Sequence, residues 1–154
     1  MKNDSVNSIT GFSFTIYVSG CQHQCKGCFS PQTWDYTKGD EYSVEEVFEM
    51  IQSSRHKNVS IIGGDPFNIF YRNETVELIK MIKEKTNKKV YVWTGYTKDV
   101  VDSFIDTSII DYLIDGKFEI DKRDIRLVLR GSSNQRIYNN GIDITDELEA
   151  RKTQ

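Results

Sequence analysis

Hydrophobic and polar residues alternate in blocks along this chain, and the blocks predict strands and helices in turn. Runs rich in β-branched and aromatic residues predict four short strands, at residues 12–19, 58–62, 89–93 and 112–114. Between them, apolar residues recur at helical spacing and predict three helices, capped by Ser43, Asn73 and Thr97. Because strands and helices alternate, we expect parallel strands joined by right-handed crossovers, and hence an α/β fold.

The remainder of the chain is less regular. Residues 139–141, Asn-Asn-Gly, predict a hairpin turn between strands at 136–138 and 142–144. Residues 145–154 are expected to form a frayed helix or an irregular tail. With 154 residues and no internal repeat, the chain predicts a single domain spanning 1–154. It is shorter than the ~200–250 residues that a closed eight-stranded β/α barrel requires.

Unusual motifs follow each of the four predicted strands. They are Cys-Gln-His-Gln-Cys-Lys-Gly-Cys at 21–28, Gly-Gly-Asp-Pro at 63–66, Thr-Gly-Tyr at 94–96 and Asp-Gly-Lys at 115–117. The carboxyl ends of parallel strands meet at one edge of a sheet, which is where α/β proteins bind their ligands. We therefore expect these four loops to lie together and to form the functional site.

All three cysteines of the chain, Cys21, Cys25 and Cys28, lie in the first of these loops. A 4Fe–4S cluster normally takes four thiolate ligands, so a set of three leaves one iron open to bind another molecule. An open metal position is typical of sites that do chemistry, whereas a closed one is typical of sites that hold structure. We interpret the loop as the ligand set of a catalytic iron–sulfur cluster.

Other interpretations of these cysteines remain open at this point. Three thiols cannot pair off within one chain, and no hydrophobic signal segment precedes them, so an extracellular disulfide framework is not indicated. A redox pair of Cys25 and Cys28 leaves Cys21 unexplained, and inert thiols without a ligand are a further alternative. The main alternative is a structural zinc site with His23 as fourth ligand, in a small binding module without catalysis.

Composition and charge narrow the function further. The net charge of −3 gives no general attraction to nucleic acid or to anionic lipid. No apolar run approaches the ~18 residues of a membrane span, and together with reduced cysteines this predicts a cytoplasmic protein. Basic residues nevertheless gather between 117 and 136, where six of them accompany three acidic residues. This stretch is either a solvated surface or a docking surface for an acidic partner or a phosphate-bearing ligand.

Gly63 and Gly64 end the second predicted strand without side chains that would block a small molecule. Their backbone carbonyl groups can meet an ammonium group, with Asp65 nearby as a counter-charge, although Gly-Gly-Asp-Pro by itself is also typical of a tight turn. Four aromatic residues can stack on a planar base or shield a radical, or can serve ordinary packing. They are Phe29, Tyr36, Trp93 and Tyr96.

The spacing of Cys21, Cys25 and Cys28 resembles the cluster motif of the radical S-adenosylmethionine superfamily. Within it, residues 12–136 are most similar to the activating proteins of anaerobic (class III) ribonucleoside-triphosphate reductases. The motifs that carry this likeness are 21–28, 63–66, Trp-Thr-Gly-Tyr at 93–96, Leu-Ile-Asp-Gly-Lys-Phe at 113–118 and Arg-Gly-Ser-Ser-Asn-Gln-Arg at 130–136. Gly27 replaces the aromatic residue that usually precedes the third cysteine, and Gly-Gly-Asp replaces the common Gly-Gly-Glu. Both variants are also similar to this branch.

The resemblance implies a partial, open parallel β/α barrel of the radical S-adenosylmethionine type. It implies a 4Fe–4S cluster held by Cys21, Cys25 and Cys28 and a bound S-adenosylmethionine. The residues implied to bind this cofactor are Gly27, Cys28, Phe29, Gly63, Gly64 and Asp65.

The resemblance also implies a reaction. The reduced cluster splits S-adenosylmethionine into methionine and a 5′-deoxyadenosyl radical, which takes a hydrogen atom from a glycine of the reductase. No catalytic side chain is required beyond the cluster and the cofactor. The implied partners are the large catalytic subunit of the anaerobic reductase and a one-electron donor such as flavodoxin. Within the enzymes, the alternative is an activase of another glycyl-radical enzyme, such as a formate-lyase type.

Overall fold

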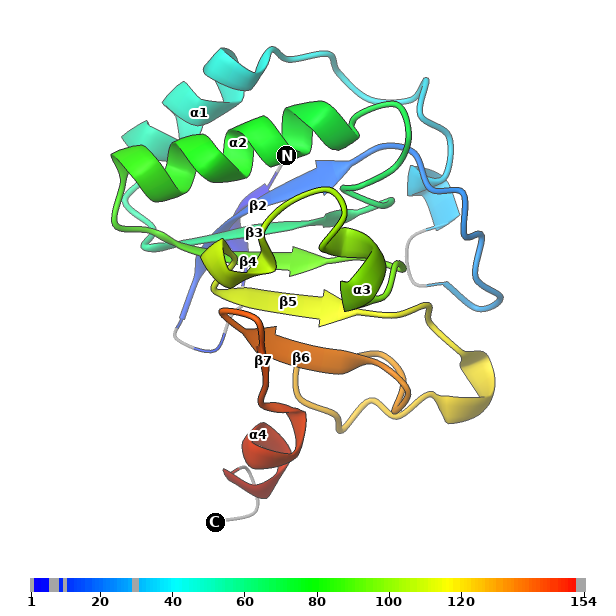
Figure 1. The fold of residues 1–154 in the computed structure, drawn as a ribbon. Helices are drawn as coiled ribbons and strands as arrows, with labels where there is room; N and C mark the ends of the chain where they lie inside the picture. Colours follow the sequence, from blue (N-terminus) through cyan, green and yellow to red (C-terminus); the bar gives the residue numbers. More distant parts are fainter. Residues whose placement is uncertain (1, 6–8, 10, 29–30, 152–154) are drawn as a thin grey trace.

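The structure is a computed structural model that describes residues 2–5, 9, 11–28 and 31–151. It is an α/β fold with one seven-stranded sheet in the order β1-β2-β3-β4-β5-β6-β7 (Figure 1). The strands are β1 (Lys2–Ser5), β2 (Ser13–Val18), β3 (Asn58–Gly63), β4 (Lys89–Trp93), β5 (Tyr112–Asp115), β6 (Arg136–Asn139) and β7 (Ile142–Asp143). Strands β2 to β5 are parallel, and β1, β6 and β7 pair antiparallel at the two sides.

The four strands that the hydrophobic pattern predicts are confirmed as β2, β3, β4 and β5, and the predicted hairpin is confirmed as β6 and β7. Strand β1 was not predicted, because its sequence, Lys-Asn-Asp-Ser, lacks β-branched and aromatic residues. This segment is a strand because it pairs with β2, and its composition alone does not predict that pairing. The sheet is therefore mixed, with a parallel centre.

The helices are α1 (Val44–Ser53), α2 (Arg72–Lys85), α3 (Lys98–Val101) and α4 (Thr145–Arg151), with short 3-10 segments at Pro31–Thr33, Thr107–Ile109 and Ile120–Lys122. Ser43 caps α1 as predicted, since its side chain accepts from the backbone N–H of Glu46. The predicted cap at Asn73 is wrong, because α2 already begins at Arg72. Asn68 instead accepts from the backbone N–H of Tyr71 before the helix starts.

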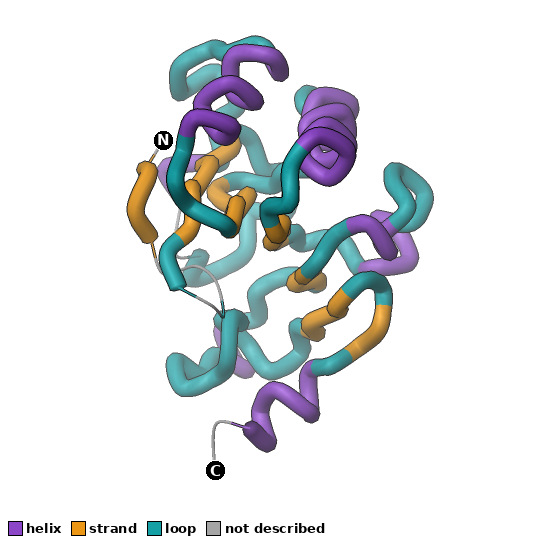
Figure 2. Tube along the Cα trace, turned by 90° about the vertical axis from the view of Figure 1, so that its left-hand side faces the viewer, coloured by secondary structure: helices purple, strands orange, loops and turns teal. Residues whose placement is uncertain are grey.

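Helices α1 and α2 lie side by side over one face of the sheet (Figure 2). Alternate residues of the central strands, among them Val90 and Val92, face these helices and form the main hydrophobic core. Tyr91 and Trp93 alternate with these valines along β4, and Trp93 packs into a second cluster around Ile114. Both faces of the parallel strands are thus covered, which is typical of α/β proteins.

Residues 145–154 were expected to be a frayed helix or an irregular tail. The structure shows helix α4 as far as Arg151, with Leu148 buried against β6, and residues 152–154 lie outside the described residues. Within the described part of the chain, no helix is both long and apolar enough to cross a membrane. The open barrel and the single domain spanning 1–154 stay predictions.

Candidate functional site

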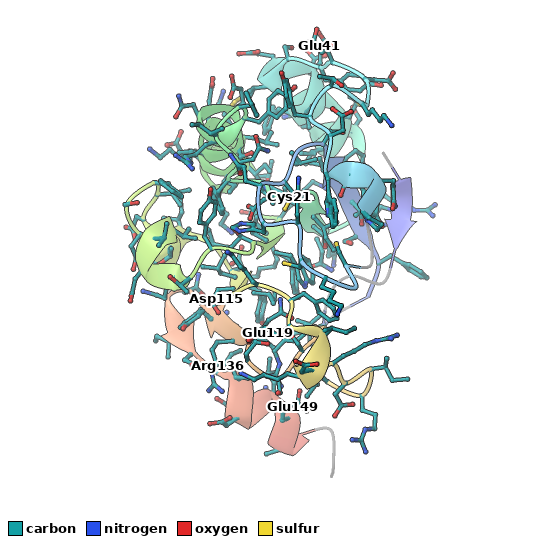
Figure 3. All side chains as sticks on the ribbon, turned by 90° about the vertical axis from the view of Figure 1, so that its right-hand side faces the viewer. Cys21, Glu41, Asp115, Glu119, Arg136 and Glu149 are labelled. Carbon is teal, nitrogen blue, oxygen red and sulfur yellow. The ribbon has the colours of Figure 1, made fainter. Side chains whose placement is uncertain are left out.

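The four loops that follow the parallel strands lie at one edge of the sheet, the edge that faces the viewer in Figure 3, with Cys21 near its centre. Hydrogen bonds join the loops in pairs. The backbone N–H of Asp65 donates to the carbonyl of Gly20 at 2.7 Å, and that of Gly116 donates to the carbonyl of Tyr96 at 3.0 Å. The predicted gathering of these motifs is therefore confirmed.

The loop from residue 19 to residue 28 is held at its start by the segment that follows it. The backbone N–H of Gly20 donates to the carbonyl of Thr33 at 2.6 Å, and that of Cys21 donates to the carbonyl of Trp34 at 3.1 Å. The loop closes with a turn in which the N–H of Cys28 donates to the carbonyl of Cys25 at 3.1 Å. Local backbone contacts thus fix both ends of the cysteine loop.

Cys21, Cys25 and Cys28 form no disulfide, and all three are partly buried. Burial raises the pKa of the Cys21 thiol, although backbone hydrogen bonds from His23 and Gln24 oppose the effect. Burial also raises the pKa of the Cys25 thiol, against a hydrogen bond from the backbone of Phe118. Because metal ligands must be thiolates, loading a metal into this loop releases protons.

The chemistry of the three donors fits an iron–sulfur cluster, since soft thiolates are its usual ligands. Cys21 and Cys25 lie close enough for their charges to interact, as do Cys25 and Cys28. Among the described residues, no three His, Cys, Asp or Glu side chains already form a group that could hold a metal ion. The loop therefore supplies donors of the right chemical type for such a cluster.

Gly63 is required by the close approach of the end of β2, and Gly64 by that of the cysteine loop that follows it. Gly63 has a φ of +109°, and a Cβ there would lie 2.7 Å from the backbone nitrogen of Val18. A Cβ on Gly64 would overlap the carbonyl oxygen of Gly20. The backbone of Gly64 also donates to the carbonyl of Val18 at 2.7 Å. These glycines bring the end of β3 directly against the loop that carries the thiols.

Asp65 is buried, and its carboxylate contacts His23, whose Nε2 lies 2.6 Å from Oδ2. Thr94 donates its hydroxyl to the same carboxylate at 2.8 Å. The sequence predicted Asp65 as a cofactor contact and offered His23 only as a ligand of the alternative zinc site, and it assigned no role to the Thr94 side chain. This contact engages Nε2 of His23 and does not involve Nδ1. A histidine that binds a metal through one ring nitrogen usually donates from the other to a carboxylate, so the zinc alternative stays open.

Gly27 lies against the loop that follows β5. Its φ is +76°, and a Cβ at this position would lie 3.3 Å from Cγ1 of Ile120 and 3.5 Å from the ring of Phe118. The second half of the cysteine loop thus rests on residues 118–120. Phe29, the other predicted cofactor residue beside Cys28, lies outside the described residues.

The predicted aromatic residues have different surroundings. The indole of Trp93 donates to the carbonyl of Leu129 at 2.7 Å, so Trp93 has a structural partner. Tyr96 makes an edge-to-face contact with the ring of His23, with ring centroids 4.7 Å apart. Tyr36 stacks on Phe70 at 3.9 Å, and both are exposed. Among the described residues of this set, Tyr96 contacts the cysteine loop through its ring.

The family described as a 4Fe-4S single cluster domain matches residues 10–138 of this chain. That span contains the three cysteines and the four loops of the site edge. The class of protein is therefore a single-cluster 4Fe–4S domain with an α/β fold.

Relatives named anaerobic ribonucleoside-triphosphate reductase-activating protein match most of this chain. The relative from Pasteurella multocida (strain Pm70) is 38% identical over 147 residues, which cover 88% of this chain and 91% of the relative. The relative from Vibrio cholerae is 36% identical, and the match covers 88% of this chain and 92% of the relative. The relative from Haemophilus influenzae is 35% identical, and the match covers 83% of this chain and 88% of the relative. The chain belongs to this family of anaerobic ribonucleoside-triphosphate reductase-activating proteins.

Proposed function

We propose that the chain is a radical S-adenosylmethionine enzyme that generates a glycyl radical in the large catalytic subunit of an anaerobic ribonucleoside-triphosphate reductase. One observation carries the proposal: three partly buried cysteines, none in a disulfide, share one loop at the carboxyl edge of the parallel strands. Three thiolates can hold a 4Fe–4S cluster and leave one iron for the amino and carboxylate groups of S-adenosylmethionine. The names of the relatives support the choice of partner.

In this proposal Cys21, Cys25 and Cys28 hold the cluster, and the neighbouring loops bind the cofactor. When bound and reduced by an external one-electron donor, the cluster would supply the electron for cleaving S-adenosylmethionine to methionine and a 5′-deoxyadenosyl radical, and that radical would take a hydrogen atom from a glycine of the reductase. Gly63 and Gly64 offer backbone groups to the methionine amine. The work of the chain is to orient the cofactor and exclude water.

Three further residues complete the proposed cofactor site. Asp65 adds a negative charge near the ammonium group of the cofactor. Gly27 and Phe29 flank Cys28, and Gly27 lets the loop rest closely on residues 118–120. None of these residues acts as a general acid or base, because a hydrogen-atom transfer needs neither.

A glycine within another protein is a suitable substrate for this site. The side chains of Gln22, Gln24 and Lys26, which alternate with the loop's partly buried positions, are exposed. The cysteine loop is therefore accessible to a segment of a partner protein, and a glycine has no side chain to obstruct its approach. A one-electron donor such as flavodoxin would reduce the cluster.

The test is to reconstitute the protein with iron and sulfide without oxygen, and then add S-adenosylmethionine, a reductant and the reductase subunit. We expect about four irons per chain, broad visible absorption, and a glycyl radical detected by electron paramagnetic resonance. The matched control is Cys25→Ala, which should lose both the iron and the radical.

Two outcomes would contradict the proposal. Stoichiometric zinc with negligible iron would identify a structural metal site instead. A radical formed on a formate-lyase-type enzyme, but not on the reductase, would keep the chemistry and replace the partner.

A further inference from the structure

The carboxylate of Asp65 is the centre of a buried hydrogen-bond network at the site edge. Asp65 is 1% exposed. Its Oδ1 accepts from the backbone N–H of Phe67 at 2.9 Å and from the hydroxyl of Thr94 at 2.8 Å. Its Oδ2 accepts from the backbone N–H of Gly95 at 2.9 Å and lies 2.6 Å from Nε2 of His23. The network joins residues from three of the four site loops.

Because an ionised carboxylate only accepts hydrogen bonds, Nε2 of His23 is the donor in its contact with Asp65. Four donors on two oxygens provide the compensation that a buried carboxylate requires. A cofactor ammonium group could bind these oxygens directly only by displacing one of the four donors. The geometry thus gives the Asp65 side chain a role within the protein, which is to hold His23.

His23 is as closely fitted as its partner. Its side chain is 7% exposed, and its ring packs edge-to-face on Tyr96. Gly95 leaves the space for this ring, because a Cβ at position 95 would lie 2.7 Å from Nε2 of His23. Gly95 is not one of the glycines with a positive φ, so the backbone conformation of the turn does not require glycine at this position. The absence of a side chain at position 95 is therefore explained by His23.

We propose that His23 is a positioning residue that fixes the cysteine loop to the sheet edge through Asp65 and Gly95. The inference rests on the proposed function, in which Cys21, Cys25 and Cys28 hold the cluster. Backbone contacts hold the loop near Cys21 and at the turn from Cys25 to Cys28, and His23 is the side chain that holds the stretch between them. It sets the separation of Cys21 and Cys25, between which it stands.

The first test replaces His23 in two ways. His23→Leu removes the donor and keeps much of the bulk, while His23→Gln places an amide N–H where Nε2 was. In the metal-free protein, we expect amide hydrogen exchange of residues 21–28 and of Gly95 to become at least tenfold faster in His23→Leu. His23→Gln should stay within about threefold of the wild type. After anaerobic reconstitution, iron per chain should follow the same order.

The second test approaches the same contact from the opposite side. Gly95→Ala should displace the ring and speed exchange of the cysteine loop, as His23→Leu does. In the double variant His23→Ala/Gly95→Ala the clash is gone, so exchange should be no faster than in His23→Ala alone. This cycle remains informative if His23→Leu fails to fold.

The results separate this inference from the proposed function. Wild-type exchange in both His23→Leu and Gly95→Ala would overturn the positioning role. Equal acceleration in His23→Leu and His23→Gln would also overturn it, since the hydrogen bond would then be irrelevant. Zinc in place of iron, or a cluster without a glycyl radical, would reject the proposed function while leaving the exchange results as evidence for the contact.

Discussion

Some positions in the site loops require glycine because neighbouring segments approach closely, and not only because of the conformation of their own turns. Gly64 shows this most directly, because its Cα faces the carbonyl oxygens of Gly20 and Thr33. Gly95 shows the same relation toward a side chain, that of His23. Each glycine permits an approach that any Cβ would prevent, and the thiol-bearing loop depends on these approaches.

Replacing Gly64 with alanine should therefore harm both stability and metal loading. Its Cβ would overlap the carbonyl oxygen of Gly20 and lie 2.8 Å from that of Thr33, and backbone atoms cannot rotate away. We expect a loss of about 1–3 kcal/mol in the free energy of unfolding, measured with urea, and less iron after reconstitution. The control is Gly141→Ala, in which the nearest atoms lie 3.7 Å or more from the added Cβ. Its left-handed backbone should still lower the free energy of unfolding by about 1–2 kcal/mol, while the iron content should stay normal. Normal iron loading of Gly64→Ala would contradict the prediction.

Asp143 provides a prediction about pH. Burial alone would raise the pKa of its carboxyl, but hydrogen bonds from Arg136 and Thr145 outweigh this effect and lower the pKa below the usual 3.8. A lowered pKa in the folded state means that the ionised form stabilises the fold. That stability is fully present above the usual pKa and is lost as the pH falls through the lower, folded value.

Urea unfolding at pH 6 and at successive values below pH 4 measures this effect. The pair of Asp143 and Arg136 is 36% exposed on both sides, so we expect Asp143→Asn to remove about 0.5–1 kcal/mol of pH-dependent stability. Asp146 is a matched control, since its side chain is 92% exposed and lies 3.5 Å from the same arginine. Asp146→Asn should retain the wild-type pH dependence, and a flat profile for that variant would refute the assignment to Asp143.

At the scale of the elements, helix α4 depends on a contact with the loop before β6. Glu149 accepts from Arg130 at 2.8 Å and from the backbone N–H of Val128 at 2.7 Å, and the Arg130 side chain is 4% exposed. Removing the carboxylate leaves a buried guanidinium without its partner acid. We expect Glu149→Ala to lower the free energy of unfolding by about 2–3 kcal/mol and to expose α4 to limited proteolysis.

The control for this prediction lies on the same helix. Glu147 pairs with Arg151 on the surface, with 56% of its side chain exposed. Glu147→Ala should change the free energy of unfolding by less than about 0.5 kcal/mol. Similar losses in the two variants would indicate that helix propensity, and not the buried ion pair, holds α4 in place.

The elements also indicate what sequence can and cannot predict here. The parallel strands were predictable, because β-branched runs such as 58–62 have few alternative structures. The carboxyl ends of parallel strands meet at one edge of a sheet, so the sequence also predicts the position of the site edge. Strand β1 was not predictable because its sequence lacks β-branched and aromatic residues. The anchoring of α4 was not predictable because it depends on Arg130, 19 positions before Glu149. The contact of His23 with Asp65 joins residues 42 positions apart, and nothing local in sequence indicates it.

At the scale of the whole molecule, the basic stretch between 117 and 136 is less positive than its sequence suggests. Four of its six basic residues pair with acidic residues of the same chain. The pairs are Lys122 with Glu119, Arg126 with Asp124, Arg130 with Glu149, and Arg136 with Asp143. Two of these acids, Glu149 and Asp143, come from outside the stretch, so folding reduces its excess charge. Docking of an acidic partner on this surface stays a prediction.

The stretch nevertheless lies beside the cysteine loop, since Ile120 adjoins Gly27, and Glu119 faces the same side as Cys21 in Figure 3. If it docks the reductase, replacing Lys122, Arg123 and Arg126 with serine should slow glycyl-radical formation several-fold at low salt while leaving iron content unchanged. High salt should reduce the difference, because exposed charges are screened. The matched control removes as much charge at the opposite edge, at Arg55, Lys57 and Lys89, which are exposed beside the amino ends of β3 and β4. Equal slowing in both triple variants would indicate a general effect of net charge, and unchanged kinetics in the first would show that this surface does not dock the reductase.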